Sequence, residues 1–123
     1  MFNNKYILIF LFGGLGTIIR TTITSININN FIHITILICN IIGSFLIGYI
    51  NSKVINKSLK IGLCTGLCGG LTTMSAFSLA YFRLIQENIV NSMIYVLISV
   101  ILCFLAVILG EKVSVLRKGD SEC

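Results

Sequence analysis

Hydrophobic residues form four long runs along this chain, and polar residues return only briefly between them. The runs extend from Tyr6 to about Ile26, from Ile32 to Ile50, from Ile61 to about Phe82, and from Ile89 to Gly110. Each run approaches the roughly 20 apolar residues that a helix needs to cross the hydrocarbon core of a bilayer. The pieces between them, 27–31, 51–60 and 83–88, are too short to hold another domain. The pattern predicts one all-α membrane domain, residues 1–123, with four transmembrane helices.

The composition supports a membrane protein. Of the 123 residues, 56% are hydrophobic and 11% are charged, and a soluble domain with this balance would expose much apolar side-chain area to water. The net charge of +5 comes from basic residues that lie mostly between and beside the apolar runs. There they meet anionic lipid headgroups. We therefore expect membrane lipid as a partner and no nucleic acid.

The basic residues also indicate how the helices are oriented. In a bundle with four spans, both termini and the second connection share one side, which carries Lys5, Lys53, Lys57, Lys60, Lys112, Arg117 and Lys118. The opposite side carries at most Arg20 and Arg83. Because basic connections stay in the cytoplasm, we expect both termini there. So large an imbalance favours a single orientation in the membrane.

Polar residues inside the second and fourth runs recur at every fourth position. The two stripes are Asn40, Ser44 and Gly48, and Tyr95, Ser99 and Cys103. This spacing puts the members of each stripe on one helix face. Hydrogen bonds between packed membrane helices would explain either stripe alone. A hydrated track would explain both together, so the two interpretations stay open.

Glycines interrupt the third run. Gly62, Gly66 and Gly70 recur at every fourth position, which lets another helix backbone approach closely. They lead into residues 69–78, where Gly, Thr and Ser are poor helix formers. Irregular backbone at membrane depth is tolerated only where it is buried in protein or faces a water-filled cavity. We therefore predict a third helix broken near its middle, where freed carbonyl oxygens can bind a small cation and a helix N-terminus can face an anion.

The absence of Asp, Glu and Lys from all four runs excludes several classes of function. The single histidine, His33, has no neighbouring nucleophile, so we do not expect an enzyme. A proton-coupled exporter needs a membrane-embedded carboxylate. The main alternative, a small four-helix multidrug or cation exporter, would need a Glu in the first run, which has none. A scaffold subunit would need no polar stripes, so passive permeation fits best.

Three segments carry unusual strings: GGLGTIIR at 13–20, CNIIGSFLIG at 39–48 and TGLCGGLTTMSAFS at 65–78. In this order they resemble the glycine-rich segment ending in Arg, the Asn-x-x-Gly-Ser-Phe segment and the Gly-Gly-x-Thr-Thr-Phe-Ser-Thr-Phe-Ser signature of the Fluc/CrcB family of bacterial fluoride channels. The third string is the most specific, because so odd a sequence inside a membrane span rarely arises by chance. The resemblance covers nearly the whole chain.

The resemblance implies a fluoride-specific channel that passively exports fluoride across the bacterial cell membrane, built as a dimer of antiparallel subunits. It implies a fluoride pathway along Asn40, Ser44, Met74, Ser75, Phe77, Tyr95, Ser99 and Cys103. It also implies a structural sodium ion, not transported, on the backbone carbonyls of Gly69 and Thr72, and structural roles for Arg20, Gly70 and Thr73.

The chemistry of fluoride agrees with this assignment. The anion is small and strongly hydrated, so a selective path must replace water with hydrogen-bond donors, which Asn40, Ser99 and Tyr95 carry. The edge of an aromatic ring is electropositive, so Phe77 can also face the anion.

The chain departs from the family pattern at several positions. Met74 replaces the first Phe of the signature, and Ala76 replaces the Thr between its two Phe residues. Three further positions lack a usual Thr, Glu or Ser: Ile36, Ala80 and Cys103. These changes weaken a polar and aromatic track while 69–73 stays intact. Together with the charge imbalance, they favour a related chain of opposite orientation as the dimer partner over an identical one.

Overall fold

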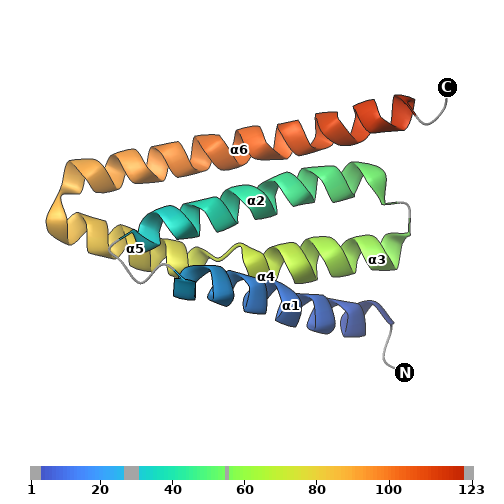
Figure 1. Ribbon diagram of the computed structural model, residues 1–123, viewed down its shortest axis with the longest axis horizontal. Coiled ribbons are helices and arrows are strands. Elements are labelled where there is room, and N and C mark those ends of the chain that lie inside the picture. Colours follow the sequence, from blue (N-terminus) through green and yellow to red (C-terminus); the bar gives the residue numbers. More distant parts are fainter. Residues whose placement is uncertain (1–3, 27–30, 55, 121–123) are drawn as a thin grey trace.

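The computed structural model describes residues 4–26, 31–54 and 56–120, and within these ranges no residue lies in a strand (Figure 1). Three helices are continuous: α1 (Asn4–Ile26), α2 (Ile32–Lys53) and α6 (Ile89–Gly119). The third span is built from four pieces: α3 (Lys57–Ile61), the π-helix η1 (Gly62–Cys68), α4 (Gly69–Leu71) and α5 (Met74–Glu87). Four segments are long and apolar enough to cross a membrane, Asn4–Ile26, Ile32–Lys53, Lys57–Glu87 and Ile89–Gly119. The predicted all-helical fold with four spans is confirmed.

Two helices extend beyond the apolar runs that predict their spans. The connection expected at 83–88 is helical up to Glu87, and Asn88 alone separates α5 from α6. The Asn88 side chain accepts a 2.9 Å hydrogen bond from the Val90 N–H, so it caps α6 and makes a longer loop unnecessary. α6 ends at Gly119, nine residues beyond the last residue of the apolar run. At about 1.5 Å per residue, this adds about 13 Å of helix on the polar side of the bilayer core.

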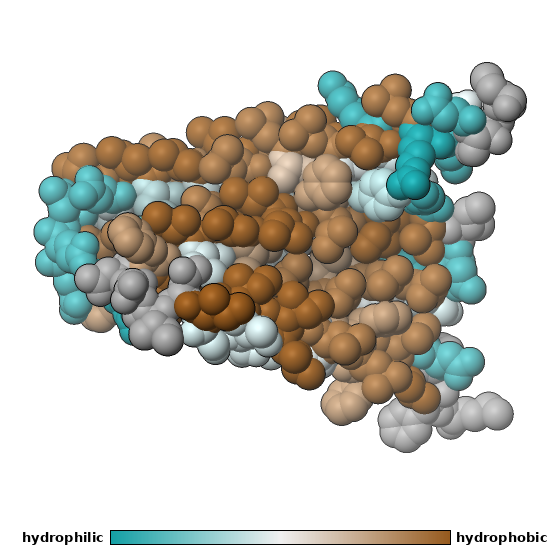
Figure 2. Space-filling model, viewed as in Figure 1, coloured by the Kyte–Doolittle hydropathy of each residue, from teal (hydrophilic) through white to brown (hydrophobic). Residues whose placement is uncertain are grey.

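The four spans form a bundle whose basic residues gather mainly at one end. The start of α1, the α2–α3 connection and the end of α6 lie at this end, and the α5–α6 turn lies at the other (Figure 1). α2 and α6 run side by side, while α1 packs against η1 and α4. Apolar side chains cover the middle of the molecule and polar ones mark both ends (Figure 2). This surface matches a bilayer, with hydrocarbon around the middle and headgroups at both ends.

Glycines bring the helices into backbone contact. A Cβ atom at Gly16 of α1 would collide with the Leu67 carbonyl oxygen of η1. A Cβ at Gly48 of α2 would collide in the same way with the Val107 carbonyl of α6. Because lipid is as apolar as the side chains, such close packing is a main source of association between membrane helices. The glycine spacing in the third run had indicated this kind of contact.

The π-helix η1 was not predicted. Its seven residues, Gly62–Cys68, follow α3 and run directly into α4. A π-helix has wider turns than an α-helix and often occurs near functional sites. Periodicity in the sequence gives no signal for it, because an apolar run with glycines every four residues fits an α-helix equally well.

Candidate functional site

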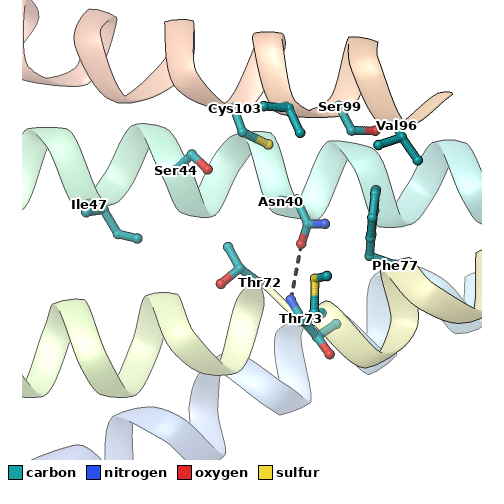
Figure 3. A pocket seen from close by; sticks show the side chains of 11 residues that line it. Asn40, Ser44, Ile47, Thr72, Thr73, Phe77, Val96, Ser99 and Cys103 are labelled. Atoms are coloured by element: carbon teal, nitrogen blue, oxygen red, sulfur yellow. Dashed lines mark hydrogen bonds between the residues drawn. The ribbon is translucent and has the colours of Figure 1, made fainter. Parts of the chain in front are cut away.

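An open groove of about 450 Å³ lies between α2, the α4–α5 junction and α6 (Figure 3). Its lining comprises Asn40, Ser44, Ile47, Thr72, Thr73, Met74, Phe77, Val96, Ser99, Val100 and Cys103. No residue of this lining carries a charged side chain. The groove therefore offers dipoles, sulfur atoms and one aromatic ring to whatever enters it.

Asn40 joins α2 to the α4–α5 junction. Its Oδ1 accepts a hydrogen bond of 3.2 Å from the Thr73 N–H, drawn as the dashed line in Figure 3. This bond fixes the side-chain amide, and its Nδ2 makes no hydrogen bond within the described residues. A primary amide carries two N–H donors on its nitrogen. Asn40 therefore presents two free donors in an uncharged groove.

The two serines of the groove differ in what their hydroxyl groups do. Ser99 Oγ donates to the Tyr95 carbonyl at 2.6 Å, so its proton is already engaged. Ser44 Oγ has no hydrogen-bond partner in the described part of the chain, although it lines the groove. Ser44 stands four residues after Asn40, one turn along α2. Free donors therefore line α2 over one turn.

The ring of Tyr95 stacks on one face of the Phe77 ring. The two ring centroids lie 5.5 Å apart with an angle of 21° between the planes. The Tyr95 side chain is buried in a cluster with Ile36 and Ala80, and its hydroxyl donates to the His33 carbonyl at 3.1 Å. The Tyr95 ring thus packs against the Phe77 ring, and the Tyr95 hydroxyl is already hydrogen-bonded to the His33 carbonyl.

Thr72 and Thr73 interrupt the backbone hydrogen bonding of the third span. Both have extended backbone, with ψ of 138° and 123°. The Thr73 N–H, which a continuous helix would bond to the Gly69 carbonyl, donates to Asn40 instead. Among the described residues, neither the Gly69 carbonyl nor the Thr72 carbonyl accepts a hydrogen bond. Unpaired carbonyl oxygens are suitable ligands for a hard cation.

Arg20 reaches the same junction from α1. Its Nε donates to the Gly70 carbonyl at 3.3 Å. A Cβ at Gly70 would lie 2.5 Å from the Gly13 carbonyl oxygen, so the contact with α1 requires glycine. The hydroxyl groups of Thr73 and Ser75 are 2.9 Å apart in the first turn of α5. Arg20, Gly70 and Thr73 therefore all make contacts at the junction.

The groove brings together six of the eight residues that the sequence assigns to a pathway: Asn40, Ser44, Met74, Phe77, Ser99 and Cys103. Tyr95 and Ser75 lie outside its lining. Thr72 and Thr73 of the junction and three apolar residues, Ile47, Val96 and Val100, complete the lining. Sequence reasoning missed these three because an apolar side chain inside an apolar run carries no distinguishing signal.

A family model described as CrcB-like protein, Camphor Resistance (CrcB), matches residues 7–111. The match includes the whole groove and both threonines of the junction. The chain belongs to the CrcB-like family. The family resemblance inferred from the three motifs is confirmed.

CrcB-like relatives match this chain over most of their length. A relative from Francisella philomiragia, named Fluoride-specific ion channel FluC, is 40% identical over 116 residues, which cover 85% of this chain and 89% of the relative. The FluC 2 channel of Staphylococcus haemolyticus is 34% identical, over 88% of this chain and 98% of its own. The FluC channel of Methylobacterium radiotolerans is 34% identical, over 94% and 87%.

Proposed function

We propose that this chain is a subunit of a fluoride-specific ion channel through which fluoride leaves the cell passively. The observation that carries this proposal is the uncharged groove in which Asn40 and Ser44 present free donors near Phe77. Fluoride gives up strong hydration only where donors replace water. The relatives named as fluoride-specific channels support the same function.

Membrane voltage alone suffices to drive export. Fluoride crosses membranes as neutral HF and ionises inside the cell. An interior-negative potential then favours the exit of one negative charge by about 2.3 kcal/mol per 100 mV. The groove has no carboxylate that would carry a proton in exchange. We therefore expect flux without a coupling ion.

Reconstitution tests this function directly. Purified protein is placed in liposomes loaded with fluoride, a potassium gradient with an ionophore sets the voltage, and an electrode measures fluoride release. We expect release that follows voltage at equal pH on both sides, and no comparable release of chloride. A requirement for a proton gradient at zero voltage would contradict the passive channel. The absence of fluoride release, with or without the partner chain, would favour the alternative, a small four-helix multidrug or cation exporter.

The channel is a dimer of antiparallel subunits in this proposal. The groove is open along one side, so a second subunit is needed to enclose the ion. The seven basic residues on one side against at most two on the other favour a single orientation for this chain. The partner is therefore a related CrcB-like chain of opposite orientation, and an identical chain is the alternative.

Expression in a fluoride-sensitive bacterial strain without its own exporter tests the pairing. We expect this chain alone to give little protection and the pair of chains to give full protection. Full protection by this chain alone, with terminal tags reporting both orientations, would refute the paired arrangement. The same tags test the proposed cell-membrane location with both termini in the cytoplasm, where the basic end would contact anionic lipid.

A structural sodium ion completes the proposal. The carbonyl oxygens of Gly69 and Thr72 fit a hard cation because neither accepts a hydrogen bond within the described residues. Gly69 is exposed, and a Cβ there would meet nothing within 4 Å, so a second subunit has room to approach. The break at Thr72 and Thr73 supplies these carbonyls, and the bound ion would hold the dimer together without being transported.

A further inference from the structure

Phe77 stands between two cavities. The groove already described lies on one side, and a second cavity of about 450 Å³ adjoins it. Met74, Phe77 and Val96 line both cavities. The second cavity is completed by Ser78, Tyr81, Met93 and Leu97. An ion that leaves the groove past Phe77 can therefore turn into this second cavity or continue beside Tyr95.

The direction beside Tyr95 is blocked by packed side chains. Tyr95 is 8% exposed, and its cluster partners Ile36 and Ala80 are 3% and 1% exposed. The hydroxyl groups of Tyr95 and Ser99 are both engaged with backbone carbonyls. Moving a small anion through an apolar, close-packed cluster without donors carries a desolvation cost of several kcal/mol. This direction is closed in the described structure.

The second cavity has a donor. Ser78 Oγ donates to the Met74 carbonyl at 2.9 Å and is engaged. The Tyr81 hydroxyl has no hydrogen-bond partner within residues 4–26, 31–54 and 56–120, and Tyr81 lines the cavity. Tyr81 also lies six residues before Glu87, the last residue of α5, so it is about 9 Å along the helix axis from the polar end.

We propose that Tyr81 supplies the hydrogen bond that receives fluoride after Phe77, and that Tyr95 is a positioning residue for the Phe77 ring. This inference rests on the proposed channel function. Hydrogen bonds to a charged acceptor are roughly twice as strong as neutral ones. The other lining residues of this cavity, Met93 and Leu97 among them, are mostly apolar. A phenol in such surroundings suits a hard, compact anion.

The two tyrosines provide a matched pair of variants, since Y81F and Y95F each remove one hydroxyl and keep the ring. Both are reconstituted in the assembly in which the unmodified chain supports fluoride flux, alone or with its partner chain. We expect Y81F to lower the flux by about ten- to 100-fold, the range for one lost hydrogen bond to a charged acceptor. We expect Y95F to lower the flux less than Y81F does, because it removes only a neutral hydrogen bond to a backbone carbonyl and keeps the ring on Phe77.

A third variant, Y95L, tests the positioning role. It removes the ring that stacks on Phe77, and we expect about a two- to tenfold loss of flux, the range for an aromatic pair. Size-exclusion chromatography must show the same assembly as Y95F, so that the loss reports ring position. Y95F keeps an aromatic ring at this position, so we expect it to restore the flux that Y95L loses.

The outcomes separate this inference from the proposed function. A strong loss in Y95F, or an unchanged flux in Y81F, overturns the assignment of the donor while fluoride flux through the unmodified chain leaves the channel function intact. Equal flux in Y95L and Y95F overturns the positioning role. Absence of fluoride flux from the unmodified chain with and without its partner would overturn the channel function, and this inference would fall with it.

Discussion

The two halves of the third span pack in opposite ways. The first half, η1 and α4, meets α1 through glycines so closely that a Cβ at Gly16 or Gly70 would strike a carbonyl oxygen. The second half, α5, borders two cavities of about 450 Å³ each. The boundary falls at Thr72 and Thr73, where the backbone is extended.

This difference shows how a short membrane protein can combine a rigid part with an open one. Close backbone packing fixes η1 and α4 against α1, and Arg20 ties the end of this half to α1 through the Gly70 carbonyl. Asn40 then holds the first residues of the open half through Thr73. Contacts outside the groove therefore fix the position of its walls. The side chains that line the groove do not have to pack against one another to hold it open.

The largest expected effect comes from adding a methyl group to the tightly packed half. In G16A the new Cβ would collide with the Leu67 carbonyl, and we expect a loss of about 3 kcal/mol of stability, since backbone cannot give way as a side chain does. G14A is the matched control, because a Cβ at Gly14 meets nothing within 4 Å. Thermal unfolding in detergent with size-exclusion detection measures both. Equal stability of the two variants would show that the glycine contact does not fix this half.

The next effect concerns the open half. N40D keeps an oxygen for the Thr73 N–H, removes both free donors and adds a negative charge to the groove. We expect fluoride flux to fall by about 100-fold, the loss for a charged hydrogen bond of about 3 kcal/mol, while the protein still assembles. N91D makes the same change at an exposed position of α6 and should conduct normally. Normal flux in N40D would exclude Asn40 as the donor.

The sequence predicts those features of the two halves that follow from apolar run length, from glycine spacing or from a family motif. Apolar run length predicted the four spans, because the bilayer requires it. The glycines of the third run predicted its close contact, and the string around Thr72 and Thr73 predicted irregular backbone. The family motifs placed Asn40 and Phe77 among the candidate residues, and the structure brings both to one groove.

Other features depend on contacts that a sequence does not display. The hydroxyl of Tyr95 was expected to donate to the anion, but the fold places it against the His33 carbonyl. Ile47 and Val96 also line the groove, but the sequence does not distinguish them from the other apolar residues of their runs. The π-helix Gly62–Cys68 has no signal in the periodicity of the sequence.

Replacing sodium in the buffer tests the proposed ion site at the boundary between α4 and α5. If the unpaired carbonyls of Gly69 and Thr72 bind sodium between two subunits, a large organic cation cannot take its place. We expect several-fold lower flux and a weaker dimer when N-methyl-D-glucamine replaces sodium at equal ionic strength. Unchanged flux together with an unchanged dimer in sodium-free buffer would refute the ion site.

The smallest effect should come from R20K, which tests whether a charge or a particular geometry ties α1 to the boundary. Arg20 donates through Nε to the Gly70 carbonyl at 3.3 Å, a long and partly buried hydrogen bond. A lysine keeps the charge but reaches the carbonyl only with its flexible end, so we expect a loss of about 1 kcal/mol in thermal stability and less than about a twofold change in flux. R83K, on an exposed residue of α5, is the control and should unfold like the unmodified chain. Because the glycine contacts stay in place in R20K, they should hold α4 against α1 without the Arg20 bond. A flux as low as that of N40D would show instead that Arg20 positions the open half, and that the two halves are less independent than their packing indicates.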